Sequence, residues 1–290
     1  RSRMQYLLQG AVEQARSYVR TQCAQAEFTY SASLKMALHN NPAAFAQISL
    51  GDDVARISFG LSEANGQRDH FGVVDEERKI NLNVTSPAIL TRLLERVLGL
   101  KTSDALALAQ SLLDWRKIGE SRLTGFYSDE YYANLQFPFR KKDADYEVLD
   151  ELLLVKGMTK EYYNRLLPFV TIYGDGKVNI NTAPPVVLYA LGFDDTLLQK
   201  MLIVRQGKDE IEGTLDDVIF TKTFDIASDV NAVVALLPQE ARAIDAINAQ
   251  GIISVSSNFF SAQIEAAVNN SAWQKQAYAV FGVRDNRVLY

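Results

Sequence analysis

A sequence pattern at residues 79–90 returns at residues 177–188. Each copy alternates apolar residues with asparagine, then places a hydroxyl residue and a proline before an apolar run. A proline in the first helical turn loses no hydrogen bond, and a hydroxyl side chain can cap the helix start. The pattern therefore predicts a short extended segment followed by a helix. Its return at this spacing predicts two related helical units, at about residues 79–173 and 177–249.

Leucine-rich periodic segments fill the chain between the two copies and after the second one, which predicts an all-α block over residues 79–249. The similarity continues past the opening pattern, and the first copy carries an insertion at about residues 117–145. Three acidic pairs are interpreted as first-turn residues of helices, where they complement the helix dipole. The pairs are Asp150-Glu151, Asp194-Asp195 and Asp216-Asp217.

Strand patterns bracket the helical block. Residues 54–61 and 67–74 flank Asn65-Gly66, a dipeptide that favours a tight hairpin, and alternation returns after residue 250. Before them, residues 4–19 have the apolar spacing of a long amphipathic helix. These patterns predict an α+β fold in which residues 1–78 and 250–290 form one sheet domain and the helical block is inserted between them.

Composition argues against nucleic-acid binding. The 290 residues carry a formal charge of −5 and a sequence pI near 5.2, whereas phosphate binding depends on a basic surface. The sequence contains no apolar run long enough to cross a bilayer. Cys23 is the only cysteine, so no intrachain disulfide can form, and it is interpreted as a buried or half-buried thiol.

Catalytic patterns are absent from the sequence. His39 and His70 are the only histidines, and neither stands in a recognisable metal or nucleophile motif, so both are interpreted as ordinary polar surface residues and the chain as no enzyme. A tyrosine-rich segment, including Tyr131, Tyr132 and Phe137, allows two interpretations: a recognition surface or a satellite core that fixes the insertion.

The chain resembles the K-type minor pseudopilins of bacterial type II secretion systems. The resemblance rests on the first helix, the Asn65-Gly66 hairpin, both copies of the repeat, and three further motifs. These are Leu112-Leu113-Asp114-Trp115, Asp129-Glu130-Tyr131-Tyr132 and Leu149-Asp150-Glu151-Leu152. The repeat is also similar to the helix-hairpin-helix domains of competence-type DNA receptors, and a DNA-binding module is the alternative function.

Membership of the K-type family would imply a pilin-like core of one long helix and an antiparallel sheet, with a large inserted helical domain. It implies the periplasmic part of an inner-membrane protein of a Gram-negative bacterium, anchored by a further N-terminal helix. The expected function is non-enzymatic: a tip subunit that initiates or caps the pseudopilus with I-type and J-type minor pseudopilins. A secretin or a secreted substrate would be a further contact, and no nucleic acid is expected.

Two sets of site residues follow from this reading. The apolar stripe of the first helix predicts a partner-binding side marked by Leu8, Ala11, Val12, Ala15 and Val19. The family's inserted domain is associated with calcium, for which Asp129 and Glu130 are the candidate ligands. Arg116 and Lys117 place cations where further carboxylates would help, which weakens the expectation of calcium. No cofactor is required.

Overall fold

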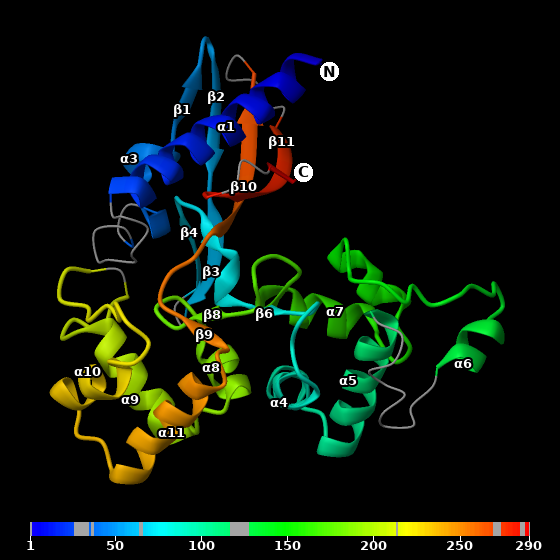
Figure 1. Ribbon diagram of the computed structural model, residues 1–290. Coiled ribbons are helices and arrows are strands. Elements are labelled where there is room, and N and C mark those ends of the chain that lie inside the picture. Colours follow the sequence, from blue (N-terminus) through cyan, green and yellow to red (C-terminus); the bar gives the residue numbers. More distant parts are fainter. Residues whose placement is uncertain are drawn as a thin grey trace. The chain divides into compact units, whose positions relative to one another are not determined.

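The computed structural model describes residues 2–25, 35, 38–63, 66–116, 128–212, 214–268, 274–284 and 288–289. The chain divides into two compact units (Figure 1). The first comprises Arg1–Glu76, Lys200–Leu237 and Ser254–Tyr290, and the second comprises Glu77–Gln199 and Pro238–Ile253. The two ends of the chain therefore belong to one unit.

The first unit is built on an antiparallel sheet with strand order β1-β2-β10-β11-β12, in which β5 also pairs with β10. Ile264 of β10 lies opposite Ile57 of β2, and Phe260 lies opposite Asp75 of β5. Strands from both ends of the chain thus alternate in one sheet, as the sequence predicts. The strands are β1 (Ile48–Leu50), β2 (Asp53–Ile57), β5 (Val74–Asp75), β10 (Phe259–Ala267), β11 (Gln274–Gly282) and β12 (Val288–Leu289).

The long helix α1 (Ser2–Gln25) lies along one face of this sheet (Figure 1). Its apolar stripe forms a single buried cluster with inward-facing strand residues such as Ile57, Ile264 and Phe281. Alternate strand residues face opposite sides, so burial follows every second position of β2. The short α3 (Pro42–Phe45) adds Phe45, whose ring packs edge-on against Tyr18 at 5.2 Å.

The predicted hairpin is present, with different strand boundaries. The pattern over residues 54–61 divides into β2 and β3 (Phe59–Glu63), and that over residues 67–74 divides into β4 (Gly66–His70) and β5. β3 pairs with β4, whereas β2 and β5 pair with β10. Alternation continues through both pieces, so the pattern does not reveal the change of partner. Gly66 pairs with Glu63 as a strand residue, and Asn65 lies outside the described residues.

The first copy of the repeat begins and ends at two paired strands of the second unit. After the short η1 (Glu76–Arg78), β6 runs in parallel beside β7, with Ile80 opposite Val170. Between them lie α4 (Pro87–Leu98), α5 (Thr102–Arg116), α6 (Asp129–Ala133), η3 (Leu149–Leu154), α7 (Lys160–Leu166) and η4 (Leu167–Phe169). The two strands are β6 (Ile80–Asn81) and β7 (Val170–Thr171).

The second occurrence of the pattern, at residues 177–188, also lies at a short strand followed by a helix. β8 (Val178–Asn179) pairs with β9 (Ile253–Ser254), and the Val178 amide donates to the Ile252 carbonyl at 2.9 Å. The helices between these strands are α8 (Pro185–Leu191), α9 (Asp195–Gln206), α10 (Ile226–Val233) and α11 (Pro238–Ala249).

The asparagines of the repeated pattern hold backbone turns. Asn81 Nδ2 donates to the carbonyls of Tyr173 and Gly174 at 2.9 and 3.0 Å, and its Oδ1 accepts the Asn83 amide. Asn179 accepts the Asn181 amide in the same way at 3.1 Å. A buried asparagine that satisfies several backbone groups explains why both copies carry this residue.

The helix caps differ between the copies. Ser86 caps α4 by accepting the Ile89 amide at 3.3 Å, as predicted. In the second copy the cap position is Pro184, because Ala183 and a second proline delay the start of α8, and Thr182 donates to the Asn179 carbonyl instead. The prediction of a hydroxyl cap is therefore wrong for the second helix.

Residues 200–237 differ from the predicted domain division, because they group with the sheet unit. Ile219 packs against the core cluster that contains α1, and Lys35 Nζ lies 2.7 Å from Asp217 Oδ2 with both side chains buried. Asp216 and Asp217 consequently stand in a loop, so their interpretation as helix-start residues is wrong. Local periodicity in the sequence does not reveal packing between such distant residues.

Among the described residues, no helix is long and apolar enough to cross a membrane.

Candidate interaction surfaces

The predicted partner-binding residues of α1 face the chain's own sheet. Leu8, Ala11, Val12, Ala15 and Val19 are all at most 6% exposed and belong to the core cluster. When the apolar stripe of a helix packs against a sheet, its side chains are buried and cannot contact another subunit. The structure therefore does not support these five residues as the partner-facing side of the helix.

The opposite side of α1 carries a different candidate surface. Tyr6 is 72% exposed, and a hollow of about 450 Å³ is lined by Arg3, Tyr6, Leu7, Gly10 and Asp53. The Arg3 guanidinium donates two hydrogen bonds to the Asp53 carboxylate, each of 2.8 Å. An exposed aromatic ring beside a fixed ion pair is the combination that interface hot spots favour. Apolar periodicity indicated only the buried side of α1. The sequence signal for the exposed surface was Tyr6, an aromatic residue among the polar positions of the helix.

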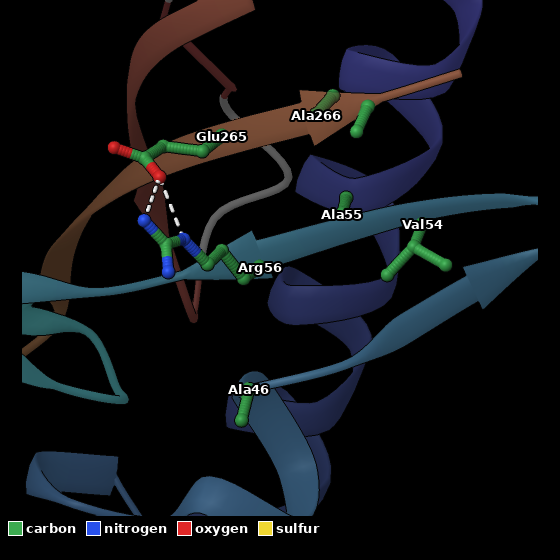
Figure 2. Close-up of a pocket in the computed structure, with 7 residues that line it drawn as sticks. Ala46, Val54, Ala55, Arg56, Glu265 and Ala266 are labelled. Atoms are coloured by element: carbon green, nitrogen blue, oxygen red, sulfur yellow. Dashed lines mark hydrogen bonds and ion pairs between the residues drawn. The ribbon is translucent and has the colours of Figure 1, made fainter. Parts of the chain in front are cut away.

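A smaller hollow of about 170 Å³ lies at β2 and β10 (Figure 2). Arg56 and Glu265 pair across it, with Arg56 Nε donating to Glu265 Oε2 at 2.6 Å, and Gln276 donates to the other carboxylate oxygen. The rest of the lining consists of alanine and valine side chains. Because its charges are already paired on the sheet surface, this hollow is a structural feature of the strand pairing.

The two histidines lie together. The rings of His39 and His70 are 5.9 Å apart, and both pack against Phe59 at 5.4 and 5.7 Å. Both side chains are partly buried. The interpretation of the two histidines as ordinary surface residues misses this contact. It forms because β4 places His70 beside His39, and no sequence motif predicts it.

The tyrosine-rich segment divides between the two interpretations. Tyr132 is 1% exposed, and its ring packs against Trp115 at 5.6 Å and Phe139 at 5.3 Å, which forms a satellite core. Phe137 is 80% exposed and Tyr131 is 40% exposed. The buried rings fix the segment, and the exposed ones remain available for contacts.

Two pairs of consecutive helices are joined at a glycine. Gly99 follows α4 and Gly192 follows α8, both with left-handed backbone angles, and α5 and α9 begin a few residues later. Asp194 accepts the Leu197 amide at the start of α9, and Asp195 lies 2.7 Å from Arg96. These carboxylates occupy the place where a phosphate would need bare amides.

The candidate calcium ligands lie beside a cation that belongs to the chain. Lys141 Nζ is 2.9 Å from Asp114 Oδ1 and 3.5 Å from Asp129 Oδ1, while the Glu130 side chain is exposed. Burial lowers the pKa of Lys141, but its hydrogen bond to Asp114 and the nearby carboxylate charges outweigh this and raise it above the usual value. Arg116 is turned away and donates to the carbonyls of Leu82 and Thr85. This position does not fit a calcium ion.

A second acidic group is formed by Asp209, Asp216 and Asp217, whose carboxylate oxygens lie within 4.8 Å of one another. Asp216 accepts hydrogen bonds from Thr214 and from the amides of Lys208 and Asp209, and these hydrogen bonds lower its pKa. Asp217 is paired with Lys35. Internal donors thus already occupy these carboxylates.

A long helix packed on an antiparallel sheet is the architecture of a pilin-like core. A family model described as type II secretion system (T2SS), protein K matches residues 61–175. Two relatives named type II secretion system protein K, from Pectobacterium carotovorum subsp. carotovorum and Aeromonas hydrophila, are 25% and 24% identical over 70% of this chain and 58% of their own length. Within residues 61–175, the chain is thus similar to type II secretion system protein K.

A solved structure has the same fold over the whole chain. It is a chain of the GspK-GspI-GspJ complex of the enterotoxigenic Escherichia coli type 2 secretion system, with a TM-score of 0.69 and 19% identity. The match covers 100% of this chain and 95% of that one. The Klebsiella pneumoniae protein K is 35% identical over 99 residues, which is 33% of this chain and 30% of its own length. The chain thus spans little more than half the length of the first two relatives.

Proposed function

We propose that this chain is the periplasmic part of a non-enzymatic minor pseudopilin, which joins I-type and J-type minor pseudopilins at the tip of the type II secretion pseudopilus. The observation that carries the proposal is the fold match over the whole chain to a structure described as a GspK-GspI-GspJ complex. An inner-membrane anchor would precede α1. The bulk of the helical unit would hinder addition of a further subunit, which gives the chain an initiating or capping role.

Partner contact would use the outer side of α1 around Tyr6. Its exposed ring and the hollow beside it offer apolar area that the fold itself leaves uncovered. The Arg3–Asp53 ion pair fixes the edge of this surface at no further ordering cost on binding. The two hairpins would then be a duplicated helix-hairpin-helix unit retained for packing.

The test is co-purification of the chain with the periplasmic domains of its I-type and J-type partners, followed by size-exclusion chromatography with light scattering. We expect a stable 1:1:1 complex. Tyr6→Glu should weaken it by about tenfold or more, as expected for loss of an aromatic hot spot. Phe137→Glu is the matched control, because Phe137 is also an exposed aromatic residue, at 80% against 72% for Tyr6, but lies in the other unit.

Failure to form the complex would refute the assembly proposal. Equal weakening by both substitutions would instead refute the Tyr6 surface while leaving the assembly itself standing. Duplex DNA is the second ligand in a parallel assay. Salt-sensitive DNA binding without partner binding would favour the hairpin-mediated alternative, which the charge of −5 and the paired Asp194 and Asp195 disfavour.

A further inference from the structure

The Lys141 ammonium stands at the meeting point of three carboxylates in the second unit. Its distances are 2.9 Å to Asp114 Oδ1, 3.5 Å to Asp129 Oδ1 and 3.5 Å to Asp143 Oδ1. The Lys141 side chain is 8% exposed and that of Asp114 is 1% exposed. The other oxygen of Asp114 accepts a hydrogen bond from Ser128. One cation thus serves carboxylates from α5, from α6 and from the loop that follows α6.

The cluster requires a cation. A carboxylate as deeply buried as Asp114 is strongly unfavourable unless a charge and hydrogen bonds compensate it. Asp143 Oδ1 is buried too, and among the described residues it has no hydrogen-bond donor, so the ammonium 3.5 Å away is its compensation. Asp143 also has a left-handed backbone conformation with φ of 53°. Its backbone N–H donates a hydrogen bond to the Trp115 carbonyl oxygen at 3.0 Å, which holds this conformation.

The arrangement is one that divalent cations also use. Calcium is bound by carboxylate and neutral oxygens gathered from several segments, and three carboxylates with a hydroxyl provide a large part of such a shell. The Lys141 ammonium supplies a single charge, donates a hydrogen bond to Asp114 and forms ion pairs with Asp129 and Asp143. The neighbouring Lys142 is committed elsewhere, since its Nζ lies 2.8 Å from Glu151.

We propose that Lys141 is a built-in structural cation that takes the position of a divalent metal ion, and that its removal opens a latent calcium site formed by Asp114, Asp129, Asp143 and Ser128. The wild-type cluster is then independent of calcium. In this chain the Lys141 ammonium links the end of α5 to α6 and to the segment up to residue 143 through its ion pairs. The cluster lies next to the aromatic rings of Trp115, Tyr132 and Phe139.

The experiment measures hydrogen exchange of peptides covering residues 128–143 in the full chain, with a chelator and with about 5 mM calcium, a concentration suited to a weak site. This local readout separates the cluster from the acidic group at Asp209, which lies in the other unit. In the wild type, exchange should be the same in both conditions. In Lys141→Ser it should rise about tenfold or more with chelator, as expected for loss of one partner of a buried ion pair, and calcium should restore protection.

Two controls complete the test. Lys142→Ser removes a neighbouring lysine outside the cluster, so calcium should not alter its exchange. Lys141→Arg keeps the charge and should remain folded and insensitive to calcium even if Lys141→Ser does not fold. Terbium, which replaces calcium and is excited through nearby tryptophan, should luminesce more strongly with Lys141→Ser than with the wild type.

Calcium-dependent protection of residues 128–143 in the wild type would overturn the proposal, because the ammonium and the ion cannot share the position. Unchanged exchange in Lys141→Ser would show that the ammonium has no structural role. Lost protection that calcium fails to restore would refute the latent site.

Discussion

The substitution Gly72→Ala tests the closest backbone contact of the sheet unit. A Cβ added at Gly72 would lie 2.2 Å from the Leu38 carbonyl oxygen and 2.6 Å from that of His39. Both neighbours are backbone atoms, so no side chain can rotate away. Two hydrogen bonds hold the segments together: Val73 amide to Leu38 carbonyl at 3.0 Å, and Asn41 amide to Phe71 carbonyl at 2.7 Å.

The expected loss of stability can be worked out from these contacts. Relief of the overlap requires the two segments to separate by roughly 1 Å, and overpacking of this kind costs about 1–3 kcal/mol. The same movement weakens two hydrogen bonds worth about 1 kcal/mol each. We expect a total of about 3–5 kcal/mol for the first unit, combining these two terms.

The assay is hydrogen exchange of the Asn41 and Val73 amides together with urea unfolding. A loss of about 3 kcal/mol corresponds to a rise of roughly a hundredfold in exchange through unfolding. Gly51→Ala is the control, since Gly51 has φ of 69° but nothing within 4 Å of the added Cβ. Its cost should be only the left-handed backbone penalty of about 1–2 kcal/mol. An equal or smaller loss in Gly72→Ala would refute the steric argument.

Two further predictions concern ionisable groups. Burial raises the pKa of Cys23 to about 12, with Asp75 adding to this and Arg284 opposing it, so a thiol reagent at neutral pH should modify Cys23 only after unfolding. Rapid modification of the folded chain would contradict this. Burial raises the pKa of Glu151, but hydrogen bonds from Lys142, the Glu147 and Val148 amides and Trp115 outweigh it and lower the pKa below 4.5. The stability that Glu151 contributes is present above pH 4.5 and is lost as pH falls below it, so Glu151→Gln should flatten that part of an acid unfolding curve. An unchanged curve would show that the carboxylate has no such role.

Local pattern was informative wherever local chemistry decides the structure. Pro87 with Ser86 before it predicted the start of α4. The acidic pairs show where this reasoning stops. Asp194 and Glu151 do accept amides at helix starts, whereas Asp216 accepts amides within a loop. The sequence around Asp216 resembles a helix start, but its surroundings come from residues far away in the chain.

Surroundings from distant parts of the chain also decide the environment of the predicted site residues. The stripe of α1 identified the apolar side of the helix but not what covers it, and the sheet that covers Leu8 and Val12 comes mostly from later in the chain. Asp129 was a reasonable metal ligand on sequence grounds. The cation that lies beside it is Lys141, which joins the cluster only when the insertion folds back on α5.

The sequence by itself determined the start of α4, the long first helix and the contribution of both chain ends to one sheet, because periodicity, capping and turn chemistry act over a few residues. Tertiary structure alone decided which side of α1 remains exposed, which residues join the sheet unit, and which cation neutralises Asp114. Those outcomes depend on contacts such as Lys35 with Asp217. These two residues lie far apart in the chain, and each compensates the buried charge of the other.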